Sequence, residues 1–183
     1  MRTSQTHPLQ IATVAVPGAP GRVGITFCPG KKQSDAMTGA WDRDLDVDLD
    51  AVRAWGAHAL VTLIEDHELR DLQVTGLGDG VRERDMTWFH LPIRDYHTPE
   101  AVFEAAWSEA GPRLGAVLRE GHDVVVHCKG GIGRAGTIAA RLLVEAGCAP
   151  QAAVDAVRAA RPGAIETEDQ HLYVLSLRTG ASA

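Results

Sequence analysis

The sequence predicts an α/β protein with a central, largely parallel sheet flanked by helices. Apolar stretches of strand length alternate with segments whose apolar residues recur at helical spacing, which is typical of parallel sheets covered by helices. Several helical segments follow one another at the end of the chain. The length of 183 residues suits one domain, and we predict a single domain over residues 1–183.

The first third of the chain predicts three strands and one helix. Residues 9–16 and 22–27 have strand character and are separated by a Gly/Pro-rich turn. Residues 46–56 carry apolar side chains at helical spacing, and Gly56 is suited to end that helix. Residues 59–64 form a continuous apolar run, as expected of a buried parallel strand.

The middle of the chain predicts an edge strand and a long helix. The glycine-rich residues 76–80 follow no convincing strand, so we predict a turn there. Residues 88–93 are predicted as a strand at the sheet edge, because Pro92 cannot donate a hydrogen bond to a neighbour. Thr98 with Pro99 predicts a helix start, and the helix is expected to reach about residue 120.

The last third contains the clearest strand, residues 123–127, which runs directly into a glycine-rich turn. A helix is predicted from about Gly133 to Gly147, where glycine ends it. Two further amphipathic helices are predicted over residues 150–161 and 167–178. This order places the glycine-rich turn at the carboxyl end of a strand, where ligands bind in such sheets.

The charge and the cysteine content of the sequence argue against several classes of protein. A net charge of −6 argues against a broad nucleic-acid or anionic membrane surface. Cys28, Cys128 and Cys148 are odd in number and widely separated, which does not suggest a disulfide framework. We therefore expect a cytoplasmic protein without membrane insertion, and the scattered histidines predict no metal site.

Residues 127–134, His-Cys-Lys-Gly-Gly-Ile-Gly-Arg, carry the chemistry. The three glycines of this segment allow successive amide groups to turn inward and bind an anion. The amino end of the following helix adds positive charge, which favours the thiolate of Cys128, the form that acts as a nucleophile. Arg134 presents paired donors that suit phosphate oxygens. The segment therefore predicts a phosphate site with its own nucleophile.

Cys128, five intervening residues and Arg134 resemble the active-site loop of protein tyrosine and dual-specificity phosphatases. Within that superfamily the chain is most similar to kinase-associated phosphatases. The similarity lies in residues 27–31, 91–95 and 163–167, in the loop itself, and in Gln170 and Tyr173. The resemblance implies the cysteine-phosphatase fold and hydrolysis without metal or organic cofactor.

The resemblance also implies a role for each matching residue. Cys128 would take the phosphoryl group as a phosphocysteine, and Asp95 would protonate the leaving oxygen and then activate water. Gln170 would orient that water. The phosphate would be bound by Lys129, Gly130, Gly131, Ile132, Gly133 and Arg134. His127 is expected to support the loop by hydrogen bonding.

One position departs from the family pattern, and several functions remain open. Ala135 stands where the family has a hydroxyl that assists the departing thiolate, which predicts a slow second step. The expected substrate is phosphotyrosine, or phosphoserine and phosphothreonine, in a protein, or a small phosphate ester. Lys129 also fits inositol phosphate or phosphoinositide phosphatases. A rival reading is a weakly catalytic phosphate-binding module, and a third is thiol redox chemistry as in arsenate reductases, although no resolving cysteine lies close to Cys128 in the sequence.

Overall fold

The computed structural model describes residues 1–36 and 39–179 and contains a five-stranded sheet in the order β1-β2-β7-β5-β6. Strands β2, β7, β5 and β6 are parallel, and β1 pairs antiparallel with β2. The predicted, largely parallel sheet is therefore confirmed. The strands are β1 Ala12–Ala15, β2 Arg22–Phe27, β5 Ala57–Thr62, β6 Thr87–His90 and β7 Asp123–Cys128. A separate two-stranded sheet joins β3 Lys32–Gln33 to β4 Trp41–Asp42.

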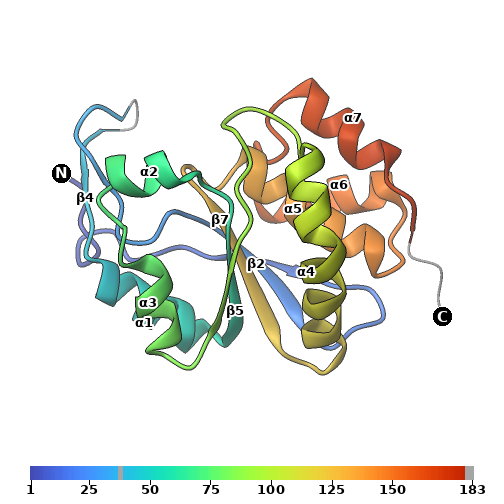
Figure 1. Ribbon diagram of the computed structural model, residues 1–183, viewed down its shortest axis with the longest axis horizontal. Coiled ribbons are helices and arrows are strands. Elements are labelled where there is room, and N and C mark those ends of the chain that lie inside the picture. Colours follow the sequence, from blue (N-terminus) through green and yellow to red (C-terminus); the bar gives the residue numbers. More distant parts are fainter. Residues whose placement is uncertain (37–38, 180–183) are drawn as a thin grey trace.

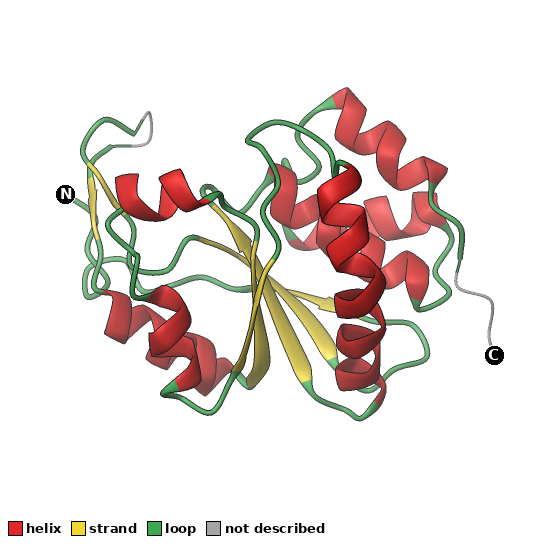
Figure 2. Ribbon diagram, in the orientation of Figure 1, coloured by secondary structure: helices red, strands yellow, loops and turns green. Residues whose placement is uncertain are grey.

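Helices cover both faces of the sheet, as Figures 1 and 2 show, with α1 and α3 on one side and α4 to α7 on the other. The strands are apolar on both faces, so a layer of helices is needed on each face of the sheet. The helices are α1 Leu45–Trp55, α2 Asp66–Asp71, α3 Leu77–Arg82, α4 Ala101–Arg119, α5 Gly133–Glu145, α6 Pro150–Ala160 and α7 Glu168–Ser176.

Strand β7 lies at the centre of the sheet and of the core. All six of its residues are buried, and Val126 is paired with Ile25 of β2 and Val61 of β5. Helix α5 packs directly after it and is buried along nearly its whole length. The segment between β7 and α5 is therefore held from both sides by the best-packed part of the molecule.

Two predictions about local structure were wrong. Residues 77–80, predicted as part of a turn, belong to helix α3, where glycine lets the helix approach its neighbours closely. A β-carbon on Gly78 would lie 2.4 Å from the Trp88 ring, and one on Gly80 would lie 2.7 Å from a methyl group of Leu49. Helix α4 begins at Ala101, after Glu100 as its cap, so Thr98 lies outside it.

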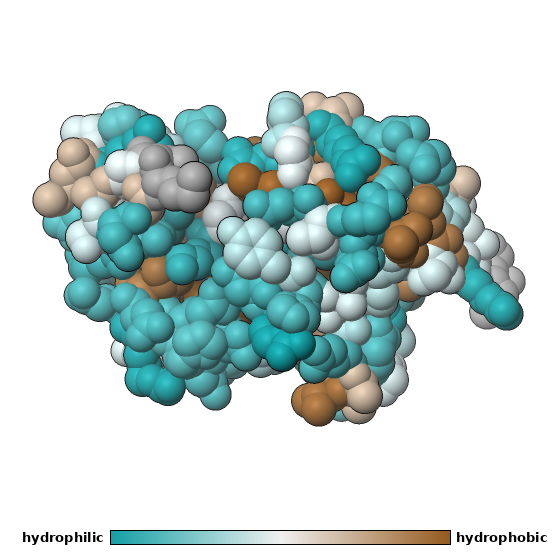
Figure 3. All heavy atoms as spheres, turned by 90° about the horizontal axis from the view of Figure 1, so that it is seen from above, coloured by the Kyte–Doolittle hydropathy of each residue, from teal (hydrophilic) through white to brown (hydrophobic). Residues whose placement is uncertain are grey.

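β6 lies at the sheet edge as predicted, but it ends at His90, so Pro92 lies outside the strand rather than within it. Seen from above the view of Figure 1, the surface is mainly hydrophilic with small, separate apolar patches (Figure 3). Within residues 1–36 and 39–179, no helix combines the length and apolar character needed to cross a membrane.

Candidate active site

Cys128 is the last residue of β7 and lies at a cavity of about 280 Å³ beyond the carboxyl ends of the parallel strands. The side chain is largely buried, with 3% of its surface exposed. The sequence-predicted residues Asp95, Cys128, Lys129, Arg134 and Gln170 all line this cavity. The fold thus brings together segments that are separated by up to 75 residues along the chain.

The carbonyl oxygens of four successive loop residues, 129–132, accept hydrogen bonds from residues outside the loop. The amide groups of residues 129–132 donate no hydrogen bond in the described part of the chain, and Lys129, Gly130 and Ile132 line the cavity. This is the arrangement that binds anions through backbone amides. The outer bonds join Lys31 to Lys129 O (3.2 Å), Arg161 to Gly130 O (3.3 Å) and Gly131 O (3.0 Å), and the Ile165 amide to Ile132 O (3.3 Å).

Gly131 is required by the loop for two separate reasons. Its φ of +68° lies in the left-handed region that favours glycine. A β-carbon there would also lie 2.4 Å from the backbone carbon of Thr26 and 2.5 Å from the amide nitrogen of Phe27. The loop is therefore seated directly on the end of β2.

Arg134 is fixed by a buried ion pair that the sequence prediction missed. Its Nη1 lies 2.6 Å from Glu68 Oε2 and its Nη2 lies 2.9 Å from Glu68 Oε1, and Nη1 also donates to the Ile93 carbonyl at 3.0 Å. Burial alone would lower the pKa of Arg134, but the hydrogen bonds and charge of Glu68 raise it overall. The guanidinium therefore stays charged at the edge of the cavity.

One donor of Arg134 has no partner. Its Nε is buried and forms no hydrogen bond within the described residues, and a buried donor of this kind is costly unless a ligand satisfies it. Its Nη2 lies 2.8 Å from Asp95 Oδ1. The predicted proton donor and the predicted phosphate ligand are therefore in direct contact, at the place where a phosphate would approach Arg134.

His127 is buried on β7 next to Cys128. Its Nε2 lies 2.8 Å from Thr62 Oγ1, and its Nδ1 lies 3.5 Å from the Cys128 carbonyl oxygen. Burial lowers its pKa to about 3, so the ring is neutral near pH 7. These contacts fit a supporting group rather than a proton carrier.

Gln170 joins two segments at the edge of the cavity. Its Oε1 accepts from the amides of Glu166 (3.0 Å) and Thr167 (3.2 Å), and its Nε2 donates to the His97 carbonyl at 3.3 Å. One N–H of its amide remains for a water molecule. The water-orienting role stays a prediction, and a role in holding the Glu166 segment is added to it.

Lys31 is a buried cation at the same cavity. It is 5% exposed, and its ammonium lies 5.0 Å from the ring of Phe27 and 4.4 Å from the ring of Trp41. Burial lowers its pKa to about 8. The sequence showed the Lys31–Lys32 pair but not which lysine turns inward.

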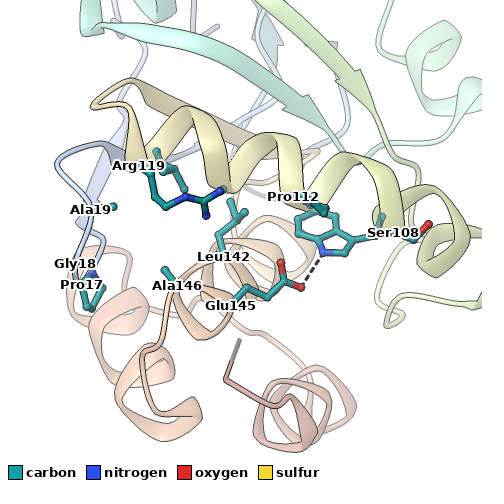
Figure 4. A pocket seen from close by; sticks show the side chains of 13 residues that line it. Pro17, Gly18, Ala19, Ser108, Pro112, Arg119, Leu142, Glu145 and Ala146 are labelled. Atoms are coloured by element: carbon teal, nitrogen blue, oxygen red, sulfur yellow. Dashed lines mark hydrogen bonds between the residues drawn. The ribbon is translucent and has the colours of Figure 1, made fainter. Parts of the chain in front are cut away.

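A larger cavity, of about 750 Å³, shares no lining residue with the cavity at Cys128. Figure 4 shows it between α4, α5 and the turn after β1. Trp107, which also lines it, donates to Glu145 at 2.8 Å. Its lining contains no cysteine and none of the predicted site residues. Size alone would therefore have selected the wrong cavity.

The fold and this loop are those of the dual-specificity phosphatase superfamily. Residues 42–174 match the family described as "PTP-SAK: Swiss Army Knife protein, DSP-PTPase phosphatase domain", and the chain belongs to this family of dual-specificity phosphatases.

Similar proteins agree with that assignment. Cyclin-dependent kinase inhibitor 3 of Rattus norvegicus is 29% identical over 164 residues, which cover 88% of this chain and 74% of that protein. A crystal structure of kinase associated phosphatase, with its catalytic site cysteine replaced by serine, matches with a TM-score of 0.79 and 26% identity over 92% of this chain and 93% of that one. The active form of Tk-PTP matches with a TM-score of 0.64 and 30% identity over 87% and 96% of the two chains.

Proposed function

We propose that this protein hydrolyses phosphate monoesters through a phosphocysteine formed on Cys128. The observation that carries the proposal is the loop after β7, which lines the cavity: its carbonyls are bonded to other segments, while its amides and Arg134 Nε have no hydrogen-bond partner in the described residues. Such a ring of donors suits the three equatorial oxygens of a phosphoryl group in transfer. Cys128 lines the same cavity.

The catalytic steps follow from these positions. Cys128 attacks phosphorus while the loop amides and Arg134 bind the phosphate oxygens. Asp95 donates a proton to the leaving oxygen, and water then hydrolyses the phosphocysteine with Gln170 nearby. Because Ala135 has no hydroxyl for the departing thiolate, the second step is expected to limit turnover.

The preferred substrate class is phosphotyrosine in proteins, with phosphoserine and phosphothreonine as further substrates. Family membership and the resemblance to kinase-associated phosphatases support this choice. The alternative is an inositol phosphate or phosphoinositide, because Lys31 and Lys129 both line the cavity and could bind a second phosphate. We further propose a single phosphatase domain over residues 1–183 that acts in the cytoplasm without a metal or organic cofactor.

A substrate panel tests the proposal. Phosphopeptides, inositol phosphates and an aryl phosphate are assayed with the wild type, C128S and D95N. We expect turnover by the wild type, none by C128S, and a loss of about 10²-fold or more in D95N. Full turnover by C128S would refute the mechanism. Tight phosphate binding without turnover would favour a binding module, and thiol-dependent arsenate reduction without ester hydrolysis would favour redox chemistry.

A further inference from the structure

The phosphate loop, residues 128–134, is held from outside by Arg161, a residue to which no sequence motif pointed. Arg161 donates from Nε to the Gly131 carbonyl at 3.0 Å and from Nη2 to the Gly130 carbonyl at 3.3 Å. Its guanidinium forms no ion pair with any residue that the structure describes. Two successive carbonyls of the loop are therefore the protein groups that this cation binds.

The turn that follows α6 fixes the position of Arg161. Residues 161–164, Arg-Pro-Gly-Ala, have the pattern of a type II turn, in which the residue after proline has a positive φ. Gly163 has a φ of +82°, and the Ala164 amide donates to the Arg161 carbonyl at 3.0 Å. The Arg161 amide donates to the Val157 carbonyl of α6 at 2.8 Å. The backbone that carries the guanidinium is therefore bonded on both sides.

The carbonyls that Arg161 binds determine the direction of two amide groups. No peptide bond in the described part of the chain is cis, and in a trans peptide the C=O of one residue and the N–H of the next point in opposite directions. The Gly131 and Ile132 amides therefore point away from Arg161. Neither donates a hydrogen bond within residues 1–36 and 39–179, and Ile132 lines the cavity at Cys128.

Without a bond from outside the loop, the orientation of these two peptide groups would be weakly determined. The first of them joins Gly130 to Gly131, and glycine allows backbone rotations that other residues resist. A β-carbon on Gly130 would meet no other described segment within 4 Å, so side-chain packing does not fix this position. A cation on the carbonyl side also polarises the peptide and strengthens its N–H as a donor. Arg161 therefore supplies both direction and polarisation.

We propose that Arg161 is a positioning residue of the phosphate loop, which turns the amides of Gly131 and Ile132 toward the substrate phosphate. This inference rests on the proposed function, in which the loop amides bind the phosphate oxygens. Arg161 itself does not line the cavity, and it acts through its bonds to the two carbonyls. Donors that are fixed in advance stabilise the charge of a transition state without a cost of reorganisation.

Variants of Arg161 test this role. The wild type, R161A and R161K are assayed with para-nitrophenyl phosphate, and calorimetry measures the binding of orthovanadate, which mimics the five-coordinate phosphorus of the transfer step. We expect R161A to lower kcat/KM about 10²-fold and to weaken vanadate binding by a similar factor, because two donors to the equatorial oxygens lose their orientation. R161K keeps the cation and one bond to a carbonyl, so it should recover about tenfold of each loss.

R158A is the matched control. Arg158 lies near the end of α6 and also donates to two carbonyls, those of Ala164 at 3.1 Å and Ile165 at 3.0 Å, but neither belongs to the phosphate loop. R158A should therefore keep the kcat/KM and the vanadate affinity of the wild type, while urea unfolding should show similar losses of unfolding free energy in R158A and R161A.

Three results would overturn the role of Arg161 and leave the proposed function intact. They are a wild-type kcat/KM in R161A, equal losses of activity in R158A and R161A, and no recovery in R161K. Full turnover by C128S would instead overturn the proposed function. The vanadate affinities of the wild type, R161A and R158A would then still decide whether Arg161 orients the donors of the loop.

Discussion

Replacing Glu68 by glutamine removes the carboxylate that fixes Arg134. The two side chains form a bidentate pair in which Arg134 is 1% and Glu68 7% exposed. Glutamine keeps the size of the side chain and one acceptor, but it leaves the buried guanidinium without its main counter-charge. Removing one partner of a buried pair costs about 3–5 kcal/mol. We expect E68Q to lose about 3 kcal/mol of unfolding free energy, since the Ile93 carbonyl and Asp95 still contact Arg134.

The same change should weaken substrate binding. An Arg134 side chain that has lost a charge-assisted hydrogen bond, worth about 1.5 kcal/mol, is less well oriented toward the phosphate. The KM for an aryl phosphate should therefore rise about tenfold.

The pH dependence of stability should change too. Burial raises the pKa of Glu68, but the hydrogen bonds from Arg134 outweigh it and lower the pKa overall. The stability from Glu68 is present above its ordinary pKa and is lost as the pH falls through the folded-state value.

Urea unfolding followed by tryptophan fluorescence measures the stability, and steady-state kinetics measure KM. E100Q is the control, because Glu100 forms an exposed ion pair with Arg94 and is 63% exposed. Its removal should cost less than about 1 kcal/mol. The reasoning is refuted if E68Q loses no more unfolding free energy than E100Q. It is also refuted if the unfolding free energy of E68Q falls at low pH in the same way as that of the wild type.

Three further changes have defined outcomes. A135S should speed phosphocysteine hydrolysis about tenfold by giving the thiolate one hydrogen-bond donor, and rapid-quench kinetics should show a smaller phosphoenzyme burst than in the wild type. Lys31 binds its proton less tightly when folded, with a pKa of about 8 against an ordinary 10.5, so stability should rise with pH between these values. In the wild type this rise in unfolding free energy should amount to about 3 kcal/mol at most. In K31M, urea unfolding measured at several pH values between about 8 and 10.5 should show a much smaller rise. G131A should lose about 3 kcal/mol or more in thermal unfolding, because its methyl group overlaps the backbone of β2.

Local patterns in the sequence predicted most of the strands and the position of the loop. Strand β7 could be predicted because three successive valines end in a glycine-rich turn, and both signals lie within a few residues of each other. The boundaries were less exact. β1 is shorter than residues 9–16, and α4 begins after Glu100, because the last hydrogen bonds of an element depend on its neighbours.

The glycines of α3 show where local patterns mislead. Several glycines in a short segment usually indicate a turn, but here Gly78 and Gly80 lie in a helix that packs closely on Trp88 and Leu49. The reason for these glycines lies in the opposing side chains. A pattern along the chain does not contain those neighbours.

The sequence by itself determined the position of the loop and brought Cys128 and Arg134 together, because both lie within one short segment whose conformation depends on its own glycines. Only the tertiary structure decided which carboxylate holds Arg134, since Glu68 lies 66 residues away along the chain. It also decided that Lys31 turns into the cavity and that Glu166 lies over Gly133. The charge and proton affinity of these groups follow from burial and from partners that only folding brings together.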